Sequence, residues 1–191
     1  VDTNDAWIRS RTGIAARRVV GADESLGELS GLAAERALEM AGWQADSLDL
    51  IVLATSTPDD LFGSAPRLQA RIGAVNAVAF DLTAACSGFL FGLVTAAQYI
   101  RSGAMRRILV VGADQLSRWV DWDDRRSCVL FGDAAGALVM EASTDGKDDL
   151  EGFLLRSDGR RGGVLQLPQV TERRDLVGDA SHQRGGFEPI Q

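Results

Sequence analysis

The stretch that decides the fold is Ala79-Phe80-Asp81-Leu82-Thr83-Ala84-Ala85-Cys86-Ser87-Gly88-Phe89. Its beginning completes an apolar run over residues 75–82, which is typical of a buried strand. Small residues follow, and then a long apolar segment with helical spacing that reaches Ser102 and ends at Gly103. Cys86 therefore lies where a strand turns into a helix, which indicates an α/β protein.

Strand and helix patterns alternate on both sides of this stretch. Helices are predicted over residues 5–9, 24–42 and 64–72, and strands over residues 50–54, 108–111, 127–131, 135–140 and 152–157. Gly112 is expected to end the strand over residues 108–111. Because each early strand is followed by a helix, we predict a mostly parallel or mixed sheet with helices on both faces.

Composition excludes several classes of function. The chain has 191 residues and a net charge of −7, which does not favour binding to nucleic acid. It has no apolar run near the roughly 20 residues that span a bilayer, and its start does not resemble a signal peptide. Two cysteines do not make a disulfide framework. We therefore expect a cytoplasmic protein that lies away from membranes and has no metal site.

Both ends of the sequence are abrupt. The chain starts without Met, in residues that already read as a capped helix, and it stops at Gln191 after a polar, glycine-rich stretch. We expect a fragment in which residues 1–170 form one half of a protein, incomplete at its start. Residues 171–191 are expected to form a loop that leads toward an absent second half.

The position of Cys86 suits a nucleophile. Free backbone N–H groups at a helix N-terminus stabilise a thiolate, and the small neighbours Ala84, Ala85 and Ser87 leave the sulfur uncrowded. The alternative is that Cys86 is a small buried apolar residue, and the local sequence leaves both open. Cys128 lies inside a strand pattern and is predicted to be structural.

Residues 81–89 resemble the nucleophile motif of β-ketoacyl-ACP synthase III, a condensing enzyme of the thiolase superfamily. Other stretches resemble this family in the same order along the chain, namely residues 2–8 with 11–14, 110–114 and 130–137. The resemblance implies a thiolase-like α/β fold, of which this chain is the first of two duplicated halves.

The resemblance also implies roles for individual residues. It implies that Cys86 accepts an acyl group, that Trp7 and Arg125 sandwich the adenine of coenzyme A, and that Thr3 and Arg11 hold the nucleotide end. An indole face and a guanidinium plane both stack on a purine. The alternatives are that Trp7 is a half-buried helix residue and that the two arginines are solvated surface charges.

An acyl pocket is implied by the same resemblance. Its apolar walls fall on Leu116, Phe131 and Leu165, which would otherwise be ordinary core residues. A residue contributed across a dimer interface falls on Leu61, with neighbouring Phe62 as the alternative. Because these side chains are bulky, we expect a short pocket and acetyl-CoA as the preferred primer.

The implied activity is a two-step condensation of an acyl-CoA with malonyl-ACP that starts fatty acid biosynthesis. Coenzyme A and acyl carrier protein are then substrates and partners, a homodimer is expected, and no further cofactor is needed. The family completes its site with a His and an Asn from the second half. His182 lies too early and in the wrong context for this role, so the fragment alone is expected to be inactive.

Two alternatives remain open at this point. One is a related ketosynthase of secondary metabolism, which the range of accepted substrates would distinguish. The other is a non-catalytic interaction module that has lost the second half, which the full reading frame would distinguish.

Overall fold

The computed structural model describes residues 1–170 and 186–187. These residues divide into two compact units. The first unit consists of residues 1–17, 116–132, 156–170 and 186–187, and the second of residues 18–115 and 133–155. Among the residues described, no helix is long and apolar enough to cross a membrane.

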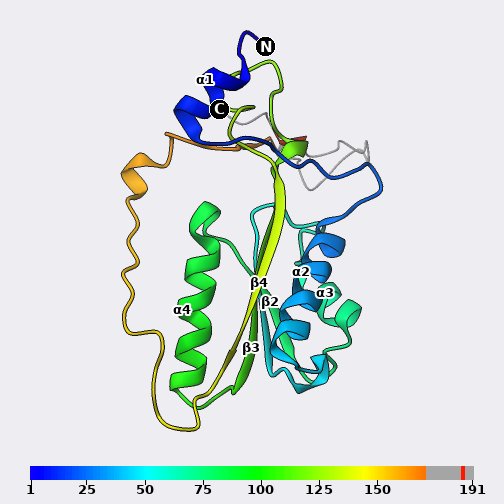
Figure 1. The fold of residues 1–191 in the computed structure, drawn as a ribbon, viewed down its shortest axis with the longest axis vertical. Coiled ribbons are helices and arrows are strands. Elements are labelled where there is room, and N and C mark those ends of the chain that lie inside the picture. The colour runs from blue at the N-terminus through cyan, green and yellow to red at the C-terminus, as the bar shows by residue number, and fades with distance from the viewer. Residues whose placement is uncertain (171–185, 188–191) are drawn as a thin grey trace, which may run out of the picture. The chain divides into compact units, whose positions relative to one another are not determined.

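The second unit is built on a four-stranded sheet, which Figure 1 shows edge-on between its helices. The strand order is β2-β1-β3-β4. The strands are β1 (Leu50–Ala54), β2 (Val78–Leu82), β3 (Arg107–Gln115) and β4 (Asp133–Glu141). β1 pairs in parallel with both β2 and β3, and β4 runs antiparallel to β3. β1 is buried at all five positions because it lies inside the sheet with helices on both sides.

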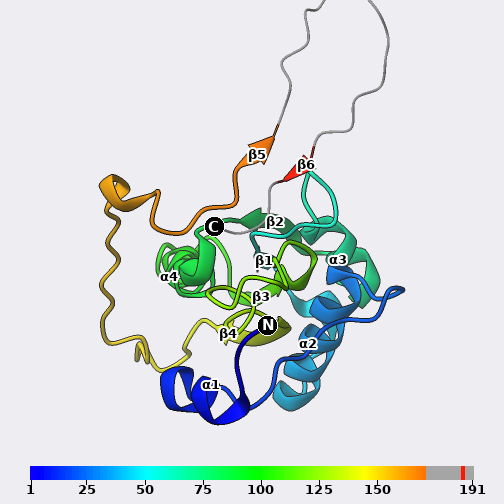
Figure 2. The same ribbon diagram turned by 90° about the horizontal axis from the view of Figure 1, so that it is seen from above.

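Helices cover both faces of this sheet, as Figure 2 shows from above. Helices α2 (Leu26–Ala41) and α3 (Ala65–Ile72) pack on one face, and α4 (Gly88–Arg101) packs on the other. α2 begins with a capping box formed by Ser25 and Glu28, and it ends at Gly42 with φ 70°. A short 3₁₀ turn, η1 (Ala45–Ser47), leads into β1.

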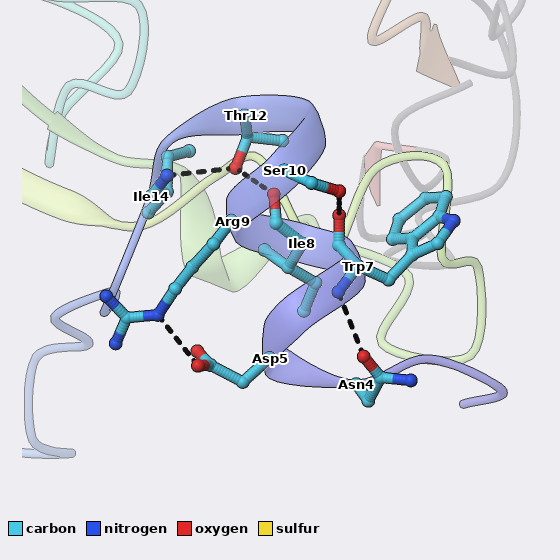
Figure 3. Close-up of polar contacts among 8 residues, drawn as sticks. All are labelled: Asn4, Asp5, Trp7, Ile8, Arg9, Ser10, Thr12 and Ile14. Carbon is cyan, nitrogen blue, oxygen red and sulfur yellow. Dashed lines mark hydrogen bonds and ion pairs between the residues drawn. The ribbon is translucent and has the colours of Figure 1, made fainter.

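The first unit contains less regular structure. It holds α1 (Asp5–Thr12), the 3₁₀ turns η3 (Leu116–Arg118) and η4 (Gly159–Arg161), and the antiparallel pair β5 (Gln169–Val170) and β6 (Gly186–Phe187). The side chain of Asn4 caps α1 by accepting a hydrogen bond from the N–H of Trp7 (Figure 3). The apolar cluster of this unit is centred on the buried residues Val120, Cys128 and Val129.

The predicted α/β class, mixed sheet and helices on both faces are confirmed. The expected end of a strand at Gly112 is wrong, because β3 continues to Gln115. Gly112 is paired on both sides, with Ala54 and Gly136. A Cβ at Gly112 would lie 3.1 Å from the ring of Phe89, so this glycine makes room for a side chain of α4 and does not end the strand.

Two predicted strands are wrong. Residues 127–130 form turns, because the backbone N–H groups of Ser127 and Cys128 both donate to the carbonyl of Asp124. Residues 152–157 form no strand, and there Phe153 and Leu154 are exposed on a segment without a strand partner. An apolar run becomes a strand only where a neighbouring strand pairs with it. The strand predicted from residue 75 starts only at Val78, because residues 73–77 form the turn that ends α3.

Part of the sequence interpretation falls beyond the structure. Most of the predicted loop over residues 171–191, including His182, lies outside the described residues.

Candidate functional site

Cys86 lies in a one-turn 3₁₀ segment, η2 (Ala85–Ser87), between the end of β2 and the start of α4. Ala85 precedes it with φ +47°, and no other non-glycine residue in the described part of the chain has a positive φ. Such a conformation is strained for a residue with a Cβ and recurs at functional turns. Cys86 is exposed, which contradicts the alternative that it is a buried apolar residue. Cys128 is buried, as predicted, but it lies in a turn.

Close packing of α4 on the sheet fixes the position of this turn. A Cβ at Gly88 would lie 3.3 Å from Ala54, and a Cβ at Gly92 would lie 3.2 Å from Val110. Because glycine has no side chain at these two positions, the first turns of α4 approach β1 and β3 closely. Because the start of the helix is held against the strands, the thiol of Cys86 is carried on a rigid support.

A partly buried polar network joins the carboxyl ends of β1 and β3 near the same edge of the sheet. Oδ1 of Asp114 accepts hydrogen bonds from Oγ1 of Thr55 at 3.3 Å, the N–H of Ser56 at 2.8 Å and Oγ1 of Thr57 at 3.3 Å. The N–H of Thr55 also donates to the carbonyl of Leu82 at 3.0 Å, at the end of β2. The network therefore fixes the ends of three strands, one of which leads to Cys86. Open α/β sheets carry their ligand sites at this edge.

An exposed apolar tip lies on the loop over residues 59–64, in the same unit as Cys86. Leu61 is 85% exposed and Phe62 is 97% exposed. Gly63 has φ +108°, which a residue with a side chain rarely adopts. Two large apolar side chains on an ordered tip are typical of a contact site.

In the first unit, three of the predicted coenzyme A residues come together, although Arg125 lies far from the other two in the sequence. The guanidinium carbons of Arg11 and Arg125 each lie 5.4 Å from the ring centroid of Trp7. Nη1 of Arg125 donates to the carbonyl of Asp2 at 2.8 Å. Trp7 and Arg125 are therefore neighbours, as a stacking clamp requires.

The clamp is closed in this arrangement. A purine between the indole and the guanidinium would need about 7 Å, or two contact distances of roughly 3.5 Å. The 5.4 Å separation means that Arg125 would have to move outward to admit a base. The predicted residue Thr3 has a buried hydroxyl without a hydrogen-bond partner among the described residues.

The predicted walls of the acyl pocket divide between the units. Leu116 and Phe131 pack in the same apolar cluster as Trp7. Leu165 belongs to the same unit but is 54% exposed. Leu61 belongs to the second unit with Cys86. Leu116 and Phe131 are thus brought together, whereas Leu165 is not part of their cluster.

Sequence reasoning missed the strained backbone of Ala85 and the network around Asp114. Nothing in the sequence marks Ala85, since alanine is not a residue that favours positive φ. It also missed Gln115, which is fully buried, and neither polar atom of its side chain has a hydrogen-bond partner within the described part.

Comparison with known proteins gives a consistent result. A family model described as 3-oxoacyl-[acyl-carrier-protein (ACP)] synthase III matches residues 80–159. The chain is 70% identical over 191 residues to a β-ketoacyl-[acyl-carrier-protein] synthase III of Prochlorococcus marinus (strain MIT 9313), covering 100% of this chain and 56% of the relative. The chain therefore spans about half the length of the curated relatives it matches.

Solved structures agree with this match. The 3-oxoacyl-(acyl carrier protein) synthase III from Pseudomonas aeruginosa PAO1 superimposes with a TM-score of 0.82 and 44% identity, over 89% of this chain and 53% of that one. A priming β-ketosynthase from the R1128 polyketide biosynthetic pathway superimposes with a TM-score of 0.71 and 39% identity, over 74% of this chain and 43% of that one. The predicted thiolase-like fold is thereby confirmed.

Proposed function

Because this chain belongs to the β-ketoacyl-ACP synthase III family and matches the N-terminal part of its members, we propose that it supplies the nucleophile of a decarboxylative condensation. The observation that carries the proposal is an exposed Cys86 on a strained turn where β2 leads into α4. A nucleophile must be accessible and held in place, and both conditions are met.

In the first step, the Cys86 thiolate attacks the carbonyl carbon of an acyl-CoA. The bond from that carbon to the sulfur of coenzyme A breaks, coenzyme A leaves as a thiolate, and the acyl group remains on Cys86 as a thioester. Backbone N–H groups at the start of α4 favour negative charge at this position.

In the second step, malonyl-ACP loses carbon dioxide, and the electron pair released forms a carbon–carbon bond to the acyl carbon. The bond to Cys86 breaks, which restores the thiolate and leaves a β-ketoacyl-ACP. The His and Asn that the family resemblance implies for this step are expected in the second half of the protein.

Trp7 and Arg125 would stack on the adenine of coenzyme A, with Arg11 and Thr3 at its nucleotide end. Their support is the cluster of one indole and two guanidinium groups in the first unit. Positive charge next to a stacking surface suits a ligand that carries both a purine and phosphates.

The primer would be short, with acetyl-CoA preferred. Leu116, Phe131, Leu165 and Leu61 are the candidate walls, and forcing a longer chain among packed side chains costs typically about 1–3 kcal/mol. The protein would take part in fatty acid biosynthesis in the cytoplasm, as a homodimer. The exposed side chains of Leu61 and Phe62 support a contact with a second subunit.

The test is a rate series in the full-length protein, with malonyl-ACP and acyl-CoA primers of increasing length. We expect the rate to fall steeply beyond butyryl-CoA. Equal rates with octanoyl-CoA and acetyl-CoA would contradict the short pocket.

Such equal rates would favour the second candidate, a ketosynthase of secondary metabolism, which the similarity to a priming β-ketosynthase of a polyketide pathway supports. A full-length protein that forms no acyl-enzyme with any primer would favour a non-catalytic module.

A further inference from the structure

Asp81 has a role in the second unit that the proposed chemistry does not use. It lies near the end of β2, five positions before Cys86 in the sequence, and it pairs with Leu53 of β1 in the sheet register. Its carboxylate accepts hydrogen bonds from the N–H of Ser64, at 3.0 Å to Oδ1 and 2.8 Å to Oδ2, and from the N–H of Ala65 at 2.6 Å. Asp81 thus caps α3 from another element.

This capping replaces the local one. Ser64 stands at the N-cap position of α3 but its side chain makes no capping bond, because its Oγ instead accepts from the N–H of Asp59 at 3.0 Å. A carboxylate that accepts two backbone N–H groups at a helix start makes charge-assisted hydrogen bonds, which are about twice as strong as neutral ones. Asp81 is therefore a strong link between β2 and the start of α3.

The same link fixes one end of the loop over residues 59–64. The other end is held by Asp59, whose carboxylate accepts from the N–H of Leu26 at 3.3 Å and of Gly27 at 2.9 Å. Asp60 orders the tip by accepting from the N–H of Phe62 at 2.9 Å and from Arg67 at 2.8 Å. Hydrogen bonds therefore hold the loop at both ends and at its exposed tip. This ordering reduces the entropy lost when the tip makes a contact.

Glycine at position 63 fits the same arrangement. Its φ of +108° turns the chain toward Asp81, and a Cβ there would lie 3.5 Å from the carboxylate. The backbone conformation itself excludes a side chain at this position without strain. Gly63 and Asp81 together determine where the tip ends and α3 begins.

We propose that Asp81 is a positioning residue for acyl-chain selectivity. Its carboxylate ties the loop that presents Leu61 and Phe62 to the end of β2, so that the tip keeps a fixed place on the unit that carries it. The inference rests on the proposed function, in which one of these two side chains reaches across a dimer interface and borders the acyl chain held by the second subunit. A tip held in place limits chain length, whereas a tip free to shift accepts longer chains.

The experiment measures selectivity in the full-length protein. The quantity is the ratio of kcat/KM for octanoyl-CoA to that for acetyl-CoA, at a temperature where every variant is folded. Asp81→Asn keeps the size of the side chain but leaves one acceptor oxygen. The other carboxylate oxygen is replaced by an NH₂ group, which cannot accept a hydrogen bond. We expect the ratio to rise about tenfold. A tip that is free to shift avoids part of the free-energy cost of packing a longer acyl chain against it.

A second variant and a matched control separate positioning from general damage. Gly63→Ala disturbs the same loop without changing the carboxylate, and it should raise the ratio in the same direction, which keeps the test decisive if Asp81→Asn fails to fold. The control is Asp49→Asn, because the Asp49 carboxylate also accepts two backbone N–H groups, those of Arg106 at 2.7 Å and Arg107 at 2.9 Å. Asp49 precedes β1, at the opposite end of the strands, so its loss should leave the ratio within twofold.

The outcomes separate a failure of the positioning role of Asp81 from a failure of the proposed function. If the wild-type protein forms an acyl thioester on Cys86 but Asp81→Asn and Gly63→Ala keep the wild-type ratio, the positioning role is wrong and the proposed function stands. The role is also wrong if Asp49→Asn raises the ratio equally. If the wild-type protein forms no thioester on Cys86, the proposed function fails, and the inference fails with it.

Discussion

The two compact units support their candidate residues in different ways. In the second unit, Cys86 follows a regular strand, opens a long helix and rests on a sheet whose central strand is completely buried. In the first unit, Trp7 lies on a short helix, and Arg125 and Phe131 lie in or beside turns. A bond-forming atom needs a fixed position, whereas binding a large ligand tolerates and often needs movable loops. The cluster of Trp7 with Arg125 and the close packing of α4 on the sheet beside Cys86 fit this difference.

The largest effect is expected where α4 packs closely on the sheet and a side chain is added. In Gly92→Val, the first added carbon would already lie 3.2 Å from the buried Val110, so α4 must move away from the sheet. We expect a loss of about 3 kcal/mol in the free energy of unfolding, together with slower acylation of Cys86. Urea denaturation and a single-turnover acylation assay in the full-length protein would measure both.

Gly136→Val is the matched control. A Cβ at Gly136, in β4, would meet no atom within 4 Å. If both substitutions destabilised the protein equally, the close contact between α4 and the sheet would not be what supports Cys86.

The next effect concerns the strained turn. Ala85→Gly should retain or slightly improve stability, because glycine adopts φ +47° without strain. Ala85→Val should lose about 2 kcal/mol, because a β-branched residue fits this conformation poorly. We expect acylation of Cys86 to slow in Ala85→Val and to stay near normal in Ala85→Gly. Similar acylation rates in the two variants would show that the backbone of Ala85 does not aim the thiol.

A smaller effect is expected in the first unit. Replacing Trp7 or Arg125 by Ala removes a stacking contact worth about 1–3 kcal/mol, so the Michaelis constant for acyl-CoA should rise about tenfold. The reaction of preformed acyl-enzyme with malonyl-ACP should be unaffected. Unchanged Michaelis constants in both variants would rule out stacking of Trp7 and Arg125 on the adenine. A slower reaction of preformed acyl-enzyme with malonyl-ACP would show that these residues also affect the condensation step.

The smallest effect is electrostatic. Hydrogen bonds from the N–H groups of Arg107 and Arg106 hold the pKa of Asp49 below its ordinary value of 3.8. Because the folded-state pKa is depressed, this stabilisation is complete above the ordinary value and is lost as the pH falls through the folded-state pKa. Asp49→Asn should therefore lower the unfolding temperature near pH 7, and the difference from wild type should shrink below about pH 4. Thermal unfolding at both pH values would check this, and a difference that does not depend on pH would contradict it.

Much of the second unit could be predicted from the sequence, because its signals are local. Apolar runs, helical spacing and the glycines after α2 and α3 gave the elements and the position of Cys86. The first unit was harder. Residues 127–130 have the apolar content of a strand, and only their hydrogen bonds to Asp124 make them a turn.

Contacts between distant positions could not be predicted. Gly112 looked like the end of a strand because the sequence does not show that Phe89 packs on it. The link from Asp81 to the start of α3 joins residues that are 17 positions apart, and it follows no sequence pattern. The cluster of Trp7 with Arg125 was expected only because of a family resemblance.

The most direct test of the central claim is to locate the acyl group on the protein. The full-length protein would be incubated with labelled acetyl-CoA, digested at low pH and mapped by mass spectrometry. We expect the label on the peptide that contains Cys86, no label on Cys128, and no labelling in Cys86→Ala. Label on Cys128, or label that persists in Cys86→Ala, would contradict the assignment of Cys86 as the nucleophile.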